Sequence, residues 1–276
     1  MPKLFSVASW NVEHFAMDPE RVKRVIAFLD AQKPDVFGLY EVEGSVVFGE
    51  LVARMPGYTF QITEGPQTQE ILVGIRKTVT AFITQKVEFK SGTTHMRPGQ
   101  LVTVVKDGVN YGLLFLHLAS GNDPRGMGLR DDMLERALDF RAVLDRTEGG
   151  PGQARYVFLG DLNTMGMKYP YDKSIDATIE LAKWDAYAAK AKVGMKRLAK
   201  THEASWYNGS KSSLPPSNLD HVFASTNLKF RNFRRADGQQ AQVAVRGWVQ
   251  EKTPAAQDRW IANYSDHSLL YFEVHS

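Results

Sequence analysis

Two polar side chains follow the apolar run YVFLG, at the point where a buried strand is expected to end. Asp161 and Asn163 stand two positions apart in the segment GDLN. A carboxylate and a carboxamide offer oxygen ligands to a hard cation, and the carboxamide also donates hydrogen bonds to a phosphate. The same residue types cap helices and turns. The choice between chemistry and capping depends on what stands at the ends of the other strands.

Several other expected strands also end in, or begin from, a residue of a catalytic type. Carboxylates, carboxamides and imidazoles are the groups that bind a divalent cation and move protons during hydrolysis. Each alone is commonly structural, because short motifs arise by chance. Only the set, taken in order along the chain, indicates a hydrolytic site. The residues are Asn11, Glu41, His117, Asp161, Asn163, Asp220, His221, Asp266 and His267.

The elements that must position these residues alternate between strand and helix patterns. Asp107-Gly108 is a strong hairpin signal inside 100–118. Hairpins mixed with single helices favour antiparallel or mixed sheets with helices outside, that is, a two-sheet α/β sandwich. The expected strands are 4–10, 35–42, 70–77, 79–89, two within 100–118, 155–161, 219–225 and 268–274. The expected helices are 18–32, 46–55, 128–146 and 173–190, and the main irregular segments are 62–70, 91–100, 119–129, 148–154 and 207–218.

Composition limits the class of protein. The chain has 276 residues without a repeat or a long linker, which favours a single domain over 1–276. It has no cysteine, which excludes a disulfide framework and thiolate chemistry. The N-terminal segment lacks the pattern of a signal peptide, and no stretch approaches the roughly 20 apolar residues of a membrane span. We expect a monomeric, soluble, cytoplasmic protein, although a secreted form with its signal removed would look the same.

Positive charge is concentrated in two runs, 190–200 and 228–235, within a net charge of +3. Such runs are either solvated surface or a contact for a polyanion. Trp206 and Tyr207 stand between the two runs. Aromatic rings with cations hold single strands and flipped bases, which makes Trp206 a candidate substrate contact. The alternative is that Trp206 packs in the core.

The blocks SWN, PDVFGLYEV, FLHL, FLGDLN, NLDHVFAS and SDH resemble, in this order, those of the endonuclease/exonuclease/phosphatase superfamily. This is the group of DNase I and the AP endonucleases, and the segment QEILVGIRK is similar to the DNase I branch. The resemblance covers nearly the whole chain. It implies a DNase I-like four-layer sandwich and hydrolysis of a phosphodiester with Mg²⁺, for which Mn²⁺ or Ca²⁺ can substitute. Tyr40 and His221 depart from the usual pattern, which bears on substrate preference.

The resemblance implies a metal site and a base. Glu41 would hold the metal, with Asn11 and Asp266 contributing. His267 would be the general base, because an imidazole titrates near neutral pH. Asp220 would orient it.

The remaining roles concern the phosphate and the leaving group. Asp161 would position the attacking water, and Asn163 would donate a hydrogen bond to a phosphate oxygen. His117, oriented by Glu70, would protonate the leaving oxygen or hold a nonbridging one. Arg97 would neutralise phosphate charge. His14, His95 and His202 fall outside the matching blocks and are interpreted as surface residues.

Three functions remain in competition. The first is a DNase I-like nuclease acting on DNA or RNA. The second keeps the same site but hydrolyses a lipid or small-molecule phosphoester. The third is a binding protein that has lost activity, against which the full set of site residues argues. Mild basicity, with Arg97 and Glu70, favours nucleic acid as the partner.

Overall fold

The structure is a computed structural model that describes residues 2–15, 18–43, 45–63, 70–90 and 98–276. Its contacts cluster into two compact units. Unit 1 comprises Met1–Thr80, Ala199–Ser217 and Phe230–Ser276, and unit 2 comprises Ala81–Leu198 and Asn218–Lys229. The single domain predicted over 1–276 stays a prediction.

Unit 1 is built on a mixed sheet. Over the described residues, its strands follow the order β11-β15-β1-β2-β4-β3, with β14 paired to β15. β1 and β2 run parallel on either side of the α1 crossover, whereas β1–β15, β2–β4 and β3–β4 are antiparallel. The elements are β1 (Lys3–Phe15), α1 (Pro19–Ala31), β2 (Val36–Val42), α2 (Ser45–Arg54), β3 (Tyr58–Ile62), β4 (Glu70–Arg76), β11 (Lys229–Phe230), β12 (Phe233–Arg234), β13 (Gln240–Ala241), β14 (Ala244–Arg246), η2 (Trp248–Gln250), α5 (Pro254–Asn263) and β15 (Leu269–His275).

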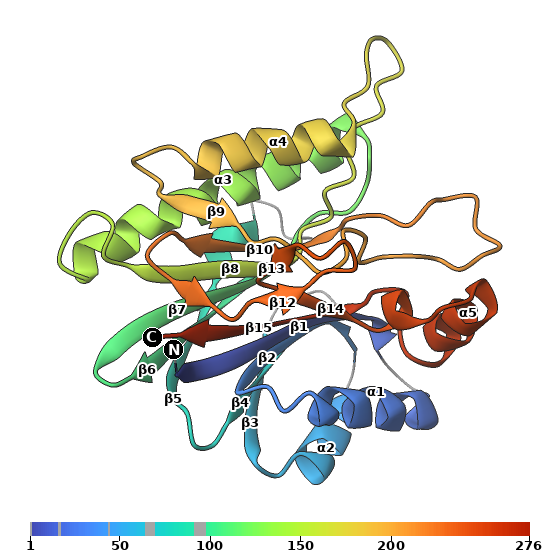
Figure 1. Cartoon of the computed structure of the whole chain (residues 1–276), viewed down its shortest axis with the longest axis horizontal. Helices are drawn as coiled ribbons and strands as arrows, with labels where there is room; N and C mark the ends of the chain where they lie inside the picture. Colours follow the sequence, from blue (N-terminus) through green and yellow to red (C-terminus); the bar gives the residue numbers. More distant parts are fainter. Residues whose placement is uncertain (1, 16–17, 44, 64–69, 91–97) are drawn as a thin grey trace. The chain divides into compact units, whose positions relative to one another are not determined.

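Helix α1 shows how the sequence builds this unit. The Asp18 side chain accepts hydrogen bonds from the backbone N–H groups of Glu20 and Arg21, and a proline occupies the first turn. The helix buries Val22, Val25, Ile26 and Leu29. Burial of each such side chain contributes about 1.5–3 kcal/mol. Figure 1 shows α1 and α2 on the same face of the sheet.

Unit 2 is built on a second mixed sheet with the order β5-β6-β7-β8-β10-β9 among the described strands. β7 and β8 run parallel, with α3 as their crossover, whereas β6–β7, β8–β10 and β9–β10 are antiparallel. The elements are β5 (Thr80–Lys86), η1 (Val87–Lys90), β6 (Gly99–Lys106), β7 (Val109–His117), α3 (Pro124–Thr147), β8 (Arg155–Asp161), α4 (Ala177–Ala188), β9 (Met195–Arg197) and β10 (Asp220–Ser225).

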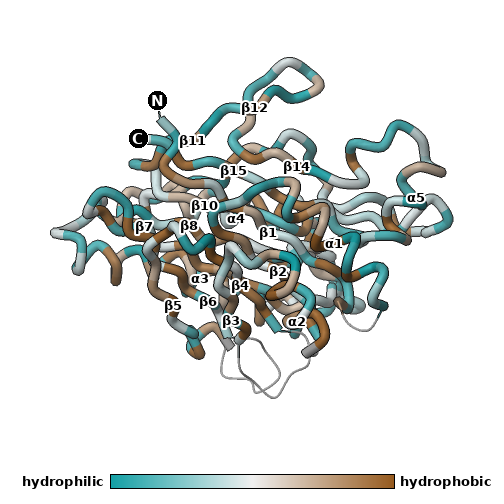
Figure 2. The backbone as a smooth tube through the Cα atoms, turned by 90° about the horizontal axis from the view of Figure 1, so that it is seen from below, coloured by the Kyte–Doolittle hydropathy of each residue, from teal (hydrophilic) through white to brown (hydrophobic). Residues whose placement is uncertain are grey.

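The core of unit 2 lies between its sheet and α3. Phe158 on β8 stacks on Phe223 on β10 with ring centroids 4.8 Å apart. Met133 and Leu134 of α3 belong to the same buried cluster. In Figure 2, hydrophobic segments are concentrated in the strands and helices, whereas most loops are hydrophilic. None of the described helices is both long enough and apolar enough to span a bilayer.

The predicted α/β class with two mixed sheets and accompanying helices is confirmed. Two helix boundaries are wrong. α3 begins at Pro124, inside the segment predicted to be irregular, because Asp123 caps the N–H of Gly126. α4 begins at Ala177 and not at 173, because Asp176 caps Thr178. α5 and the short strands β3, β9 and β11 to β14 were not predicted.

A buried ion pair fixes the two loops that follow β7 and β8. Arg130 of α3 and Glu180 of α4 are almost completely buried, and their Nε and Oε1 atoms lie 2.8 Å apart. Arg130 also donates from Nη1 to the Gly121 carbonyl at 2.6 Å and from Nη2 to the Gly166 carbonyl at 2.8 Å. Glu180 Oε2 accepts the N–H of Gly166 at 2.7 Å. The pair therefore anchors both loops to the helices.

We expect Arg130→Ala to lower the free energy of unfolding by about 3–5 kcal/mol, because the variant leaves the buried Glu180 carboxylate without its counter-charge. Arg136→Ala is the matched control. Arg136 pairs with Asp132 on the exposed face of the same helix, where a pair contributes about 0.3–0.5 kcal/mol. Urea unfolding measures both variants, and equal losses would contradict a structural role specific to Arg130.

Candidate active site

Three polar residues form a row across adjacent strands of unit 2. His117 is in register with Asp161 in the parallel pair β7–β8, and Asp161 is in register with Asp220 in the antiparallel pair β8–β10. Residues in register on neighbouring strands point to the same face of a sheet. β7 and β8 end at His117 and Asp161, and β10 begins at Asp220. The topology thus brings all three to one edge.

The row is buried and carries like charges. His117, Asp161 and Asp220 are 4%, 2% and 1% exposed. Nε2 of His117 lies 3.6 Å from Oδ2 of Asp161, and carboxylate oxygens of Asp161 and Asp220 lie within 4.8 Å of each other. Like charges directly opposite each other destabilise a sheet, and burial strengthens their repulsion. Such a row favours nearby positive charge, either an imidazolium or a cation with a preference for oxygen ligands.

Asn163 stands in a tight turn beside the row. Its φ of 51° lies in the left-handed region, which asparagine tolerates better than most residues. Its N–H donates to Oδ1 of Asp161 at 3.1 Å, and its Nδ2 donates to the Leu118 carbonyl at 3.2 Å. Capping is therefore present at Asp161, but it uses Oδ1, whereas Oδ2 is the oxygen nearer His117. The local turn and a chemical role are compatible.

Unit 1 has a second set of polar residues, which begins with Asn11 on β1 and Glu41 on the adjacent parallel strand β2. Nδ2 of Asn11 donates to Oε1 of Glu41 at 3.0 Å, and the N–H of His14 donates to Oε2 at 3.0 Å. Oδ1 of Asn11 accepts the N–H of Glu13 at 2.9 Å. Asn11 therefore orients the Glu41 carboxylate. A carboxylate oxygen accepts more than one contact, so Glu41 can also bind a cation.

Asp266 and His267, just before β15, belong to this second set. Nε1 of Trp206 donates to Oδ2 of Asp266 at 2.6 Å. His267 is held through its backbone, because its N–H donates to Oγ of Ser265 and its carbonyl accepts Nε1 of Trp10. Trp206 is half-buried and lies outside the buried cluster of unit 1. Its predicted contact with the substrate stays a prediction.

Glu70 and Arg97 are the remaining predicted site residues. Glu70 is buried at the start of β4 and accepts a short hydrogen bond from the Thr63 hydroxyl. Its predicted action on His117 stays a prediction. In unit 2, the Asp161 carboxylate lies beside the His117 ring. Arg97 lies outside the described residues, as does His95.

The structure adds Glu13 and His14 to the unit 1 set, which the sequence did not indicate. Burial and the neighbouring Asp266 carboxylate raise the pKa of Glu13. A hydrogen bond to Glu43 raises the pKa of His14, and the Glu41 carboxylate adds to the effect. His14 is exposed as predicted. The His14 shift and the contribution of Asp266 to the Glu13 shift reflect negative charge around Glu41 and Asp266, which attracts cations.

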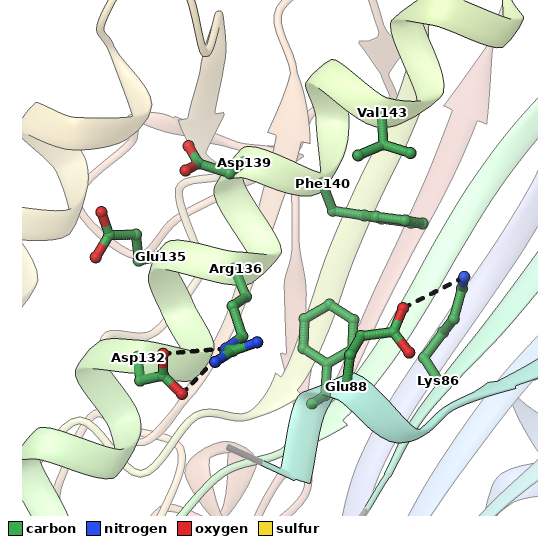
Figure 3. Close-up of a pocket in the computed structure, with 9 residues that line it drawn as sticks. Lys86, Glu88, Asp132, Glu135, Arg136, Asp139, Phe140 and Val143 are labelled. Carbon is green, nitrogen blue, oxygen red and sulfur yellow. Dashed lines mark hydrogen bonds and ion pairs between the residues drawn. The ribbon is translucent and has the colours of Figure 1, made fainter. Parts of the chain in front are cut away.

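A cavity of about 480 Å³ in unit 2 contains none of the predicted site residues. Figure 3 shows it between α3 and the segment that follows β5. Two ion pairs, Lys86 with Glu88 and Arg136 with Asp132, occupy its rim. Because these charges neutralise each other and the remaining acids are negative, the cavity is not suited to a phosphate.

The order of blocks and the two sets of residues agree with a known family. A model of the Endonuclease/Exonuclease/phosphatase family matches residues 8–267. The chain belongs to this family. The resemblance inferred from the sequence is confirmed.

One relative of this chain is named as a phosphodiesterase of tyrosyl-DNA. Tyrosyl-DNA phosphodiesterase 2 of Bos taurus is 28% identical over 172 residues, which are 58% of this chain and 42% of the relative. The chain thus matches less than half of that protein. A D. rerio TDP2 structure complexed with a single-strand DNA product has a TM-score of 0.63 and 19% identity, covering 99% of each chain.

A bacterial member gives the same result for the fold. The endonuclease/exonuclease/phosphatase from Bacteroides vulgatus has a TM-score of 0.65 and 14% identity, covering 98% of each chain. At these identities the solved structures establish the fold alone. They match the predicted DNase I-like class.

Glu41 has a φ of 62°, a left-handed backbone that is unfavourable for a residue with a Cβ by about 1–2 kcal/mol. Both Glu41→Gly and Glu41→Ala remove the carboxylate, so their difference reports the backbone alone. We expect Glu41→Gly to be more stable than Glu41→Ala by about 1 kcal/mol in urea unfolding. At the exposed β5 position Thr84, glycine should instead be the less stable substitution. The same order at both positions would contradict the assigned strain.

Proposed function

We propose that the protein is a divalent-metal-dependent phosphodiester hydrolase that acts on nucleic acid, DNA in the first instance. The observation that carries the proposal is the buried row of His117, Asp161 and Asp220. A row of this kind is costly to fold and has no evident structural benefit. It is suited to water activation and proton transfer at a phosphate.

The residues of unit 1 fit a hard cation. Their donors are carboxylate and amide oxygens, which are the ligands that Mg²⁺ and Mn²⁺ prefer, and the chain has no thiolate to favour zinc. Glu41, oriented by Asn11, would hold the ion, and Asp266 would add negative charge. When bound, the ion would neutralise charge on the phosphate and polarise it toward attack.

We propose the following roles in hydrolysis for the site residues. His267 would take a proton from the attacking water, and Asp220 would stabilise the resulting imidazolium. Asp161 would orient the water, and Asn163 would donate to a nonbridging oxygen. His117 would deliver a proton to the leaving oxygen, a role in which the adjacent Asp161 carboxylate favours its protonated form.

The substrate class rests on the relatives and on charge. Tyrosyl-DNA phosphodiesterase 2 is named for a phosphodiester between tyrosine and DNA, and the D. rerio protein binds a single-strand DNA product. We therefore propose a DNA end or strand as the substrate. Lipid or small-molecule phosphoesters are the alternative to be tested alongside it.

We expect Glu41→Gln to abolish hydrolysis and the thermal stabilisation that Mg²⁺ gives the unaltered protein, because the charged metal ligand is lost. Asp107→Asn, at an exposed hairpin position, is the matched loss of a carboxylate and should change neither. The assay uses plasmid DNA, single-stranded DNA, RNA, tyrosyl-DNA and a chromogenic phosphodiester, with EDTA as the control. Turnover by Glu41→Gln would reject the metal assignment.

For His267→Ala we expect the rate to fall by about 10²–10⁴-fold, which is the usual contribution of a general base. The backbone of residue 267 keeps its hydrogen bonds to Ser265 and Trp10 in this variant, so we expect it to fold. A rate loss below tenfold would assign the base to another residue.

If the substrate is a polyanion, the logarithm of the binding constant should fall linearly with the logarithm of salt concentration, because lysine and arginine contacts release counterions. Titration of a labelled oligonucleotide at several concentrations of NaCl measures the slope. A flat response would favour a small or lipid substrate.

A further inference from the structure

The loop between β8 and α4 forms a narrow projection, visible in Figure 1 before the start of α4. We call residues 167–175 the tyrosine hairpin. An antiparallel bridge joins Met167 and Ile175 at its base. The N–H of Tyr169 donates to Oγ of Ser174 at 3.3 Å, and the N–H of Lys168 donates to the Asn122 carbonyl at 2.6 Å.

The base of the tyrosine hairpin is rigidly anchored. Gly166 has a φ of 73°, and a Cβ there would lie 2.2 Å from the Ile175 carbonyl oxygen. The buried Arg130–Glu180 pair holds both the N–H and the carbonyl of Gly166. Because a hairpin anchored in this way is already ordered in the free protein, it loses less conformational entropy when a ligand binds.

The hairpin presents two aromatic rings. Tyr169 and Tyr171 are 39% and 87% exposed, and their ring centroids lie 5.8 Å apart in an edge-to-face arrangement. Tyr171 thus leaves most of its ring uncovered by the described residues. Beside the rings lies a groove of about 600 Å³, whose apolar lining includes Met165, Met167 and Ile175.

Two lysines flank the rings. Lys168 and Lys173 are exposed on either side of the two tyrosines. Their charge is balanced by Asp172, which lies between them in the sequence, and by Asp176, which lines the groove. A lysine pair suits phosphates on both sides of a stacked base.

The hairpin is close to a residue assigned to the phosphate. Tyr169 and Tyr171 follow Asn163 by six and eight residues in the sequence. Extended chains of these lengths span at most about 22 Å and about 29 Å. A strand of several nucleotides whose phosphate reaches Asn163 is therefore long enough to extend unpaired bases to the tyrosines.

We propose that the tyrosine hairpin is a stacking platform for unpaired bases of a nucleic-acid strand. This inference rests on the proposed function and specifies which part of the substrate is recognised: a single-stranded segment beside the bond that is cleaved. Stacking on tyrosine is independent of sequence, because every base has an aromatic face. A membrane surface fits less well, because the exposed tip carries Asp172 and lacks the large aliphatic side chains that enter a bilayer.

The test is fluorescence anisotropy with a labelled 12-nucleotide single strand and the matching duplex, in EDTA to prevent hydrolysis. We expect Tyr171→Ala to weaken single-strand binding about tenfold and duplex binding much less. Tyr171→Trp should restore binding, because it retains a stacking ring. Asp172→Asn should strengthen binding, because it removes negative charge near the strand.

Phe82→Ala is the matched control, because Phe82 is a 66% exposed ring on β5 of the same unit. It should bind like the unaltered protein. Unchanged affinity of Tyr171→Ala, or no single-strand affinity in the unaltered protein, would overturn the proposal. Loss of binding to phosphatidylserine vesicles, without loss of strand binding, would assign the hairpin to a membrane instead and would also overturn it.

A separate assay distinguishes failure of the proposed function. The unaltered protein is incubated with Mg²⁺ and a chromogenic phosphodiester too small to reach the hairpin. Hydrolysis without single-strand binding rejects the stacking platform and keeps the hydrolase. Absence of hydrolysis on every substrate rejects the hydrolase and, with it, the assignment of the hairpin to a substrate strand.

Discussion

Two buried carboxylates repel each other in the sheet of unit 2. Asp161 and Asp220 are placed opposite each other by the β8–β10 register, and both are almost completely buried. A fold that keeps such a pair must provide positive charge nearby. His117, one strand away, provides part of it when protonated.

The backbone is strained at the residues assigned to chemistry. Glu41 and Asn163 both have left-handed φ values, as do Glu13 and His14. Such positions cost about 1–3 kcal/mol each and persist where the surroundings determine them. At Glu41 the register between β2 and β4 shifts, and both carboxylate oxygens accept hydrogen bonds. The strained backbone lowers the stability of this segment, and it orients the Glu41 carboxylate.

The sequence predicted the parts of the fold that depend on local pattern. α1 follows from the Asp18 cap and the spacing of Val22, Val25 and Ile26, and the β6–β7 hairpin follows from Asp107-Gly108. The edge at which His117 and Asp161 meet follows from strands that end in polar residues, although their register could not be read from the sequence.

Other features depend on contacts between distant segments, and the sequence could not reveal them. The hydrogen bond from Trp206 to Asp266 joins residues 60 positions apart. The Arg130–Glu180 pair joins two helices, and charged residues in helices usually face solvent. The positive φ of Glu41 has no local signal, because glutamate rarely adopts it. The sequence favours neither solvated surface nor a polyanion contact for the basic run 228–235, and it does not reveal that Arg231 and Arg235 pair with Glu273 and Glu203.

The proposed hydrolysis depends on a cation held at Glu41. This is tested most directly by Mn²⁺ titration of protein with ¹⁵N-labelled histidine, followed by imidazole NMR. We predict that the ring of His14, which lies beside the Glu41 carboxylate, broadens at equimolar Mn²⁺, while the ring of His275, at the far end of β15, stays sharp. A His14 ring that stays sharp at equimolar Mn²⁺ would contradict the metal assignment.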